Sequence, residues 1–273
     1  MTGRSAALYY GKEELDLKRE VKSVAYADEN SKKENQKNDY QILHFNEKQM
    51  QKLTAGVQET LKNSQETVKP GGGLAYRFAK RAIDLILSTF ALLVLSPVFL
   101  IVAAIIVIDD PGNPFFVQYR LTEKGKTFPM LKFRSMYMDA EARFEEVMKL
   151  NETDGLAFKM EHDPRVTKVG NFIRKTSIDE LPQLINIICG HMSIIGPRPP
   201  IPREVLNYTP YQMNRLMVKG GLACYCQCSG RSDMPFDEWV ETDIQYIKER
   251  SLLVDFKILV KTFIAVLKRD GAK

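Results

Sequence analysis

A run of 24 residues, from Leu85 to Ile108, contains only apolar residues, Ser, Thr and Pro. As one helix it would be about 36 Å long, enough to cross a hydrocarbon core of about 30 Å. Ser96-Pro97 lies at its centre, and a proline there removes a backbone hydrogen bond and predicts a sharp bend. Each arm would then span roughly 18 Å, too short to cross alone. The run predicts a membrane segment that is either a kinked span or a helix-break-helix that re-enters the same leaflet.

Basic residues flank this run on both sides, with Lys80 and Arg81 before it and Lys132 and Arg134 after it. Lys and Arg are typical of cytoplasmic flanks, so their presence on both sides favours re-entry. The alternative is a helix in the core of a large soluble protein, but a chain of 273 residues is small to surround a helix that is apolar on every side. The residues alone leave the hairpin and the span open.

The segment before the run, residues 1–73, is rich in Lys, Glu, Asn, Gln and Asp and ends in Pro70 and three glycines. This composition predicts a polar extension that is disordered or loosely helical and a hinge at its end. Within it, Ile42 to Glu66 has the pattern of a weak amphipathic helix. Residues 74–110 form the predicted membrane segment.

The remaining domain, residues 111–273, alternates short β-type runs with helical patterns. Aromatic and β-branched residues around Gly125 predict a β-hairpin. From Leu252, apolar residues recur at helical spacing between lysines, which suits a helix in a lipid interface as well as one that faces a core. The predicted fold class is α+β: a membrane re-entrant helix-break-helix anchor, followed by a small, mostly helical domain with a short β-hairpin and interfacial amphipathic helices.

Several classes of site are disfavoured. Cys224, Cys226 and Cys228 alternate as on one face of a strand and form no CxxC pair, so packing is a better explanation than a metal site. The sequence contains no Walker loop, GxGxxG fingerprint or Ser/His/Asp order. A net charge of +5 suits an anionic partner, but the signatures of nucleic-acid-binding folds are missing, so no nucleic acid is expected.

The adjacent carboxylates Asp179 and Glu180 are the best candidates for chemistry. Ser177 precedes them in a capping-box pattern, so a purely structural role is one interpretation. The other is that carboxylates near fixed cations bind a divalent metal or attack phosphorus while basic side chains neutralise phosphate oxygens. The basic residues available for this role are Lys132, Arg134, Arg165, Lys168, Arg174, Arg198 and Arg231.

Arg198 lies between Pro197 and Pro199, which restricts the backbone and would present the guanidinium at low entropic cost. The alternative is a rigid loop that ends the preceding Ile-Ile strand.

Taken in order, KRAIDLIL, the Ser96-Pro97 break, FPMLKFRSM, DPRVTKVGNFIRKTSIDELPQL, GHMSIIGPRPP and SGRSDMPFDEWVETDIQYI resemble the bacterial sugar transferase family, the monotopic phosphoglycosyl transferases that act on polyprenyl phosphate. The resemblance covers about Tyr76 to the C-terminus. It departs from the family at His191, where an Asp is usual, and at Gly220, where a Pro is common.

The resemblance implies an enzyme that moves a sugar 1-phosphate from a UDP-sugar to undecaprenyl phosphate and releases UMP, with glucose or galactose weakly preferred, at the start of exopolysaccharide, capsule or glycan assembly. Asp179 would attack the phosphorus and lie at Mg²⁺, the family cofactor, with Glu180 assisting. The implied substrate-binding residues are Lys132, Arg134, Arg174, Pro197, Arg198, Pro199 and Arg231, and the implied anchor residues are Lys80, Arg81, Asp84, Ser96 and Pro97.

The resemblance also favours the re-entrant form of the anchor and makes residues 111–273 the catalytic domain, on the cytoplasmic face of the bacterial inner membrane. Downstream glycosyltransferases would be partners. Two other functions stay open: a non-catalytic membrane-anchored scaffold, and a phosphatase acting on lipid or sugar phosphates.

Overall fold

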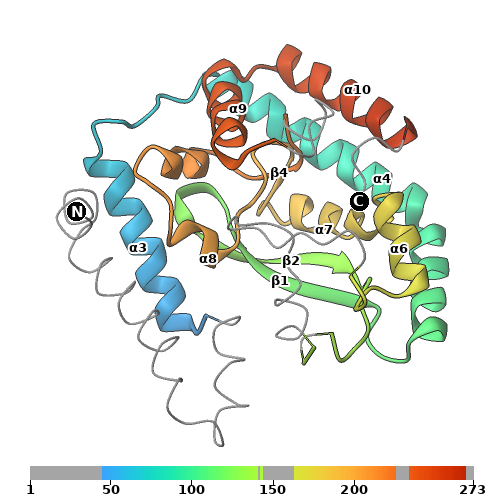
Figure 1. The fold of residues 1–273 in the computed structure, drawn as a ribbon. Helices are drawn as coiled ribbons and strands as arrows, with labels where there is room; N and C mark the ends of the chain where they lie inside the picture. Colours follow the sequence, from blue (N-terminus) through green and yellow to red (C-terminus); the bar gives the residue numbers. More distant parts are fainter. Residues whose placement is uncertain (1–44, 141, 144–162, 226–233, 269–273) are drawn as a thin grey trace, which may run out of the picture.

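The structure is a computed structural model, and it describes residues 45–140, 142–143, 163–225 and 234–268. Helices surround two small sheets (Figure 1), so the fold is of mixed α and β type, as predicted. The described helices and strands are α3 (Glu47–Asn63), α4 (Leu74–Asp109), β1 (Phe115–Leu121), η4 (Glu123–Gly125), β2 (Thr127–Phe133), α6 (Lys168–Lys175), η5 (Ile178–Glu180), α7 (Gln183–Ile188), β3 (Ser193–Ile195), α8 (Pro202–Val205), η6 (Gln212–Met217), β4 (Gly221–Ala223), α9 (Phe236–Glu249) and α10 (Leu252–Lys268).

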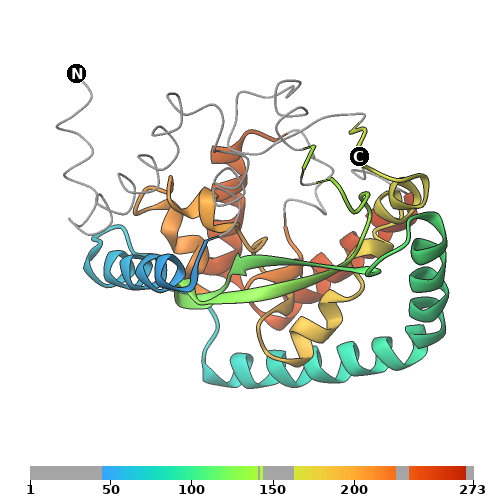
Figure 2. The same ribbon diagram turned by 90° about the horizontal axis from the view of Figure 1, so that it is seen from below.

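Helix α4 contains the apolar run and continues through Pro97. Figure 2 shows it bent, with its first part beneath the domain and its second part rising along one edge. Because Pro97 has no N–H, the carbonyl of Leu93 loses its usual helical partner. The Ser96 hydroxyl donates to that carbonyl instead, at 2.8 Å. Serine therefore satisfies the backbone group that proline leaves unpaired in an apolar segment.

Within the described residues, α4 is the one helix long and apolar enough to cross a membrane, and only 11% of its most apolar stretch is buried inside the protein. A helix in the core of a soluble protein would be mostly buried. The exposed apolar surface of α4 therefore argues against that alternative and indicates an association with a membrane.

Strands β1 and β2 form the predicted hairpin, which is antiparallel and turns at η4. Its register pairs Arg120 with Phe128 and Phe116 with Lys132, so residues 116, 118, 120, 128, 130 and 132 share one face. On the opposite face, Phe133 packs against Phe99 of α4, with 5.2 Å between the ring centroids. The end of the hairpin therefore contacts the second half of α4.

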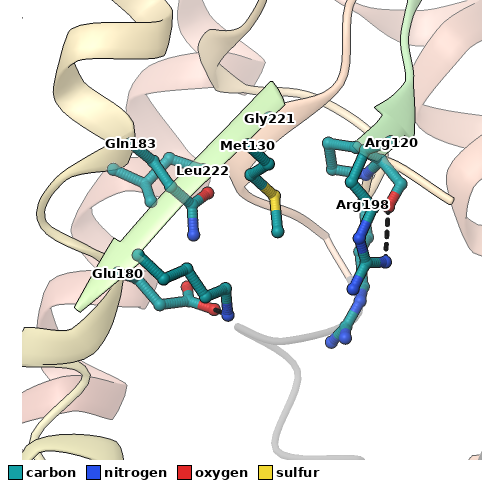
Figure 3. A pocket seen from close by; sticks show the side chains of 9 residues that line it. Arg120, Met130, Glu180, Gln183, Arg198, Gly221 and Leu222 are labelled. Atoms are coloured by element: carbon teal, nitrogen blue, oxygen red, sulfur yellow. Dashed lines mark hydrogen bonds and ion pairs between the residues drawn. The ribbon is translucent and has the colours of Figure 1, made fainter. Parts of the chain in front are cut away.

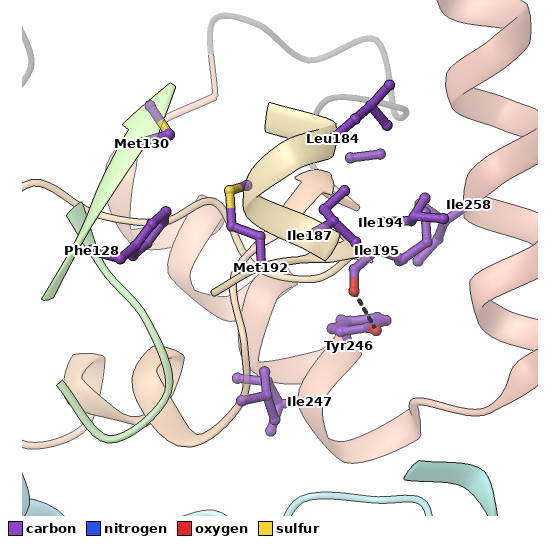
Figure 4. Close-up of a cluster of buried hydrophobic side chains, with 12 residues drawn as sticks. Phe128, Met130, Leu184, Ile187, Met192, Ile194, Ile195, Tyr246, Ile247 and Ile258 are labelled. Carbon is purple, nitrogen blue, oxygen red and sulfur yellow. Dashed lines mark hydrogen bonds between the residues drawn. The ribbon is translucent and has the colours of Figure 1, made fainter. Parts of the chain in front are cut away.

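Strands β3 and β4 pair in parallel, and this second sheet continues the main core. Gly221 is required here because a Cβ on it would lie 2.1 Å from the backbone nitrogen of Gly196. In Figure 4 the β3 residues Ile194 and Ile195 pack among α7, α9 and α10, and the Tyr246 hydroxyl donates to the Ile195 carbonyl at 3.2 Å. The strand expected before the Pro-Arg-Pro loop is therefore present, buried in the core.

The helix expected after Leu252 is also present as α10. Asp255 joins it to α4, because Lys80 Nζ and the Tyr76 hydroxyl both lie 2.9 Å from one Asp255 oxygen. The large apolar side chains exposed on α10 are Leu252, Leu253, Phe256, Val260, Phe263 and Ile264. Their exposure beside α4 fits the interfacial interpretation better than a helix that faces only a core.

Candidate active site

A pocket opens between the β1–β2 hairpin, the segment η5–α7 and the loop after β3 (Figure 3). Cationic side chains meet a carboxylate in it, which suits a phosphorylated ligand. Its lining residues are Arg120, Met130, Lys132, Glu180, Gln183, Arg198, Pro199, Gly221 and Leu222.

Glu180 lines one end of this pocket; Asp179 precedes it in η5 and does not line the pocket, but both carboxylates lie near the same cation, Lys132. Lys132 Nζ is 2.6 Å from Glu180 Oε1 and 3.8 Å from Asp179 Oδ2. The lysine therefore hydrogen-bonds to Glu180 and reaches Asp179 only through its charge. Adjacent carboxylates in the sequence thus have different environments.

Their pKa values shift in opposite directions. Burial raises the pKa of Asp179 to about 6, with a further rise from Glu180, although Lys132 and Arg174 oppose the shift. For Glu180, burial also favours the neutral form, but the charge and hydrogen bond of Lys132 outweigh it and lower its pKa. Near neutral pH both groups are ionised, and Asp179 is the more basic. A carboxylate that is basic and not hydrogen-bonded to the nearby lysine is the better nucleophile of the two.

The capping-box interpretation of this segment is wrong. Ser177 has a left-handed backbone (φ 55°, ψ 16°), and its side chain caps nothing. The Glu180 side chain turns to Lys132 instead of reaching back to Ser177. The Glu180 carboxylate is therefore paired with Lys132 and takes no part in a helix cap.

The Pro-Arg-Pro loop is fixed from two directions. The Pro197 carbonyl accepts from Gly221 N at 2.9 Å, and the Pro199 carbonyl accepts from Arg120 Nη1 at 2.9 Å. The adjacent backbone nitrogen of Leu121 donates to the Pro200 carbonyl at 2.9 Å. The loop thereby holds Arg198 at the pocket, where Figure 3 shows its side chain beside Arg120.

The other arginines expected to bind substrate, Arg174, Arg134 and Arg231, differ in where they lie. Arg174 Nε donates to Ser135 Oγ at 2.8 Å, and its charge lowers the pKa of Asp179. Arg134 does not line the pocket: its buried guanidinium pairs with Asp110, 3.3 Å away, and also donates to the Asp110 carbonyl. Arg134 follows the last paired residue of β2, and its contacts with Asp110 tie the end of α4 to the end of the hairpin. Arg231 lies outside the described residues.

The expected anchor residues make contacts inside the protein. Arg81 donates to the carbonyls of Ile187 and Ile188 at 2.7 and 2.9 Å, where a cation complements the end of α7. Asp84 is buried and accepts from Ile194 N at 3.0 Å. Together with the pair between Lys80 and Asp255, these contacts join α4 to the helices and the strand beside the pocket.

The segment that carries the dyad rests directly on the apolar helix. Ile178, the residue before Asp179, packs on a cluster that contains Val102 and Ile106 of α4 together with Ile173 and Phe133. Asp179 is therefore held next to the part of the protein that associates with a membrane.

Two polar side chains of the pocket, Arg120 and Gln183, were not predicted from the sequence. Arg120 is buried, and burial together with Arg198 lowers its pKa to about 10, so it is still protonated at neutral pH. Gln183 begins α7 and is also buried. One signal for Arg120 is present in the sequence: it alternates with Gln118 and Phe116 along a predicted strand, so the three share a face. Which residues lie opposite that face depends on the hairpin register, which the sequence does not show.

A Mg²⁺ ion at the dyad would need ligands from outside it. The described residues contain no group of three or more His, Cys, Asp and Glu side chains that could hold a metal by themselves. Mg²⁺ at phosphoryl-transfer sites is commonly held by one or two carboxylates together with substrate phosphates and waters. Asp179 Oδ2 lies beyond hydrogen-bond distance of Lys132, so the carboxylate fits this mode of binding with a bound diphosphate.

Comparison with known proteins identifies related chains. Galactosyl transferase CpsE of Streptococcus agalactiae is 43% identical over 73% of this chain and 44% of its own length. Undecaprenyl-phosphate galactose phosphotransferase of Salmonella typhimurium is 41% identical over 72% of this chain and 42% of its own length. Exopolysaccharide production protein ExoY of Rhizobium meliloti is 39% identical over 75% of this chain and 91% of its own length.

CpsE and the Salmonella phosphotransferase are more than twice as long as the region that they share with this chain. The chain therefore spans less than half of the length of these relatives. The family model described as bacterial sugar transferase matches residues 75–269, which include α4 from its second residue, the dyad and the Pro-Arg-Pro loop. This match covers more than half of the chain. The chain therefore belongs to the bacterial sugar transferase family.

Proposed function

We propose that this protein transfers a sugar 1-phosphate from a UDP-sugar to polyprenyl phosphate and releases UMP. The observation that carries the proposal is the position of Asp179, a basic, buried carboxylate held between cations and directly beside the apolar helix. A lipid phosphate cannot easily leave the interface and a nucleotide cannot enter it, so a catalyst that joins them must hold charged groups at the membrane surface.

The reaction would take two steps at one phosphorus atom. A carboxylate oxygen of Asp179 attacks the phosphorus that bears the sugar, the bond to the UMP oxygen breaks, and UMP leaves with the electron pair. An oxygen of polyprenyl phosphate then attacks the same phosphorus and displaces Asp179. The product is a polyprenyl diphosphate sugar, and the carboxylate is regenerated.

The cations around the dyad have separate roles in this proposal. Lys132 holds Glu180 ionised and lowers the pKa of Asp179, so that the nucleophile is charged near neutral pH. Arg120 and Arg198, at the opposite side of the pocket, neutralise phosphate oxygens as charge moves to the leaving group. Asp179 would hold Mg²⁺ together with the donor diphosphate, and the bound ion would neutralise part of that charge.

Two of the relatives are named for galactose, so UDP-galactose is the donor to test first, followed by UDP-glucose. The catalytic domain would face the cytoplasm, where nucleotide sugars are made, and α4 would enter and leave one leaflet. The product would pass to glycosyltransferases that extend the chain in exopolysaccharide or capsule assembly.

The test is UMP release by the full chain in lipid nanodiscs that contain undecaprenyl phosphate. We expect UMP and lipid-linked sugar in equal amounts with UDP-galactose or UDP-glucose. A scaffold would release no UMP with any UDP-sugar, and a phosphatase would produce free sugar phosphate or inorganic phosphate instead of the lipid-linked sugar. Either result would overturn the proposal.

A further inference from the structure

Helix α3 lies outside residues 75–269, the region that the family model matches, yet it packs on the catalytic domain. Figures 1 and 2 both show it beside the turn of the hairpin. Leu53 and Val57 are buried, with 2% and 1% of their surface exposed, so the helix is docked by its apolar face. A polar extension with no role in the domain would not bury these side chains.

The first contact of α3 is with the hairpin turn. Thr54 Oγ1 donates to the Gly125 carbonyl at 2.7 Å. Gly125 has a φ of +70°, and a Cβ on it would lie 2.8 Å from Val57, so the turn and the helix fit closely. Leu121, at the end of β1, packs in the same cluster as Leu53 and Val57. The helix therefore supports the strand end that carries Arg120.

The second contact is with η6. Buried Asn214 accepts from Val68 N at 2.7 Å and donates to the Glu66 carbonyl at 3.0 Å, so it fastens the linker that follows α3. The next residue, Arg215, is paired with buried Asp243 at 2.8 Å and donates to the Arg198 carbonyl at 3.3 Å. Asn214, which binds the linker, is thus directly followed in the sequence by Arg215, which binds the Pro-Arg-Pro loop.

Both contacts lead to the same loop. From the hairpin, Arg120 and Leu121 bind the carbonyls of Pro199 and Pro200. From η6, Arg215 binds the carbonyl of Arg198. We infer that the segment 46–68 positions the Pro-Arg-Pro loop and so sets the place of Arg198 in the pocket, which makes Leu53, Thr54 and Val57 positioning residues for the anionic donor.

The chain has one tryptophan, and it reports on this loop directly. The guanidinium carbons of Arg198 and Arg215 lie 5.8 and 5.1 Å from the centre of the Trp239 ring. Phe236, which packs on the α3 cluster, is 6.4 Å from Trp239 between ring centroids. A change in the loop or in the α3 cluster should therefore change how well a small quencher reaches Trp239.

The test compares Thr54→Val and Leu53→Ala with Glu59→Ala, an exposed position on the same helix. In the full chain in nanodiscs, we expect the acrylamide quenching constant of Trp239 to rise about twofold in Leu53→Ala and less in Thr54→Val, because a core truncation costs more than one hydrogen bond. Glu59→Ala should match the wild type.

The kinetic part rests on the proposed function. With UDP-galactose or UDP-glucose, whichever the wild type uses, we expect KM for the donor to rise about tenfold in Leu53→Ala and about threefold in Thr54→Val. The kcat should fall as well, but by a smaller factor than KM rises, because Arg198 both binds the donor and neutralises charge at the leaving group, while the position of Asp179 is unchanged.

Quenching constants equal to the wild type in folded variants would overturn the inference, as would a loss of kcat at constant KM. Far-UV circular dichroism establishes folding, and if Leu53→Ala does not fold, Thr54→Val decides. If the wild type releases no UMP with any donor, the proposed function fails, while the quenching result still decides whether α3 positions the loop.

Discussion

At the scale of single residues, the dyad shows how one lysine gives two neighbouring carboxylates different properties. Lys132 hydrogen-bonds to Glu180 at 2.6 Å and leaves Asp179 at 3.8 Å, so burial dominates the pKa of Asp179. The sequence could indicate that the pair was chemically important, because its local pattern is visible. Which of the two is more basic depends on a strand 47 residues earlier and could not be predicted locally.

The first prediction concerns pH. Because the pKa of Asp179 is raised to about 6, its nucleophilic form is depleted below that pH. We expect kcat/KM for UMP release to fall about tenfold per pH unit below pH 6 and to level off above about pH 7. The measurement is UMP release at low UDP-sugar between pH 5 and 8. A flat profile over this range would show that Asp179 is not the titrating nucleophile.

The second prediction follows from the same shift through stability. The folded pKa lies above the ordinary value of 3.8, so the folded protein holds its proton more tightly, and stability falls as pH rises from about 4 through about 6. Asp179→Asn removes that cost. At pH 7.5 we expect the variant to be more stable than the wild type by about 2 kcal/mol while its turnover is abolished.

Thermal unfolding at pH 7.5 and pH 4.5 provides the measurement, with Glu59→Gln as the surface carboxylate control. The gain should shrink at the lower pH, where Asp179 is protonated in the wild type. An Asp179→Asn variant that is less stable than the wild type at pH 7.5 would contradict this account of the buried charge.

The third prediction concerns Lys132→Met. Losing the ammonium leaves Glu180 buried without its partner and removes the main charge that lowers the pKa of Asp179. We expect UMP release at pH 7 to fall by about 100-fold or more and the midpoint of the pH profile to move upward. Exposed Lys126→Met, on the same hairpin, should leave both unchanged. A midpoint that stays near pH 6 would show that Lys132 does not control the pKa of Asp179.

At the scale of elements, α4 joins the membrane to the site through its two halves. Arg81 and Asp84 in the first half hold the end of α7 and the start of β3. Val102 and Ile106 in the second half support Ile178 beside Asp179. The bend between the halves allows both sets of contacts to be made by one helix, and Ser96 makes the bend compatible with an apolar surrounding by satisfying the Leu93 carbonyl.

The fourth prediction concerns Pro97→Leu. With the proline gone, a straight helix recovers the hydrogen bond to Leu93 and becomes long enough to cross the bilayer, so the two halves can no longer both reach the domain. In cells, a cysteine introduced by Asn63→Cys should be shielded from an impermeant maleimide in the wild type and labelled from outside in Pro97→Leu. The parent chain without Asn63→Cys controls for native cysteines. Labelling of the Pro97-containing chain from outside would rule out the re-entrant form.

At the scale of the whole molecule, features with a local pattern could be predicted and features that depend on distant partners could not. The hairpin around Gly125, the apolar helix and the dyad each follow from neighbouring residues. The parallel pairing of β3 and β4 depends on the close approach of Gly196 and Gly221, and the entry of Arg120 into the pocket depends on the register. Arg134 was expected at the site because of its charge, but its carboxylate partner comes from the end of α4.

The most direct test of the central claim is mass spectrometry of the enzyme incubated with UDP-sugar in the absence of polyprenyl phosphate. The account predicts a peptide that contains Asp179 and is heavier by one phosphosugar, released as lipid-linked sugar when polyprenyl phosphate is added, and absent in Asp179→Asn. An unmodified peptide under conditions in which the complete system makes product, or the same modification on a different residue, would contradict it.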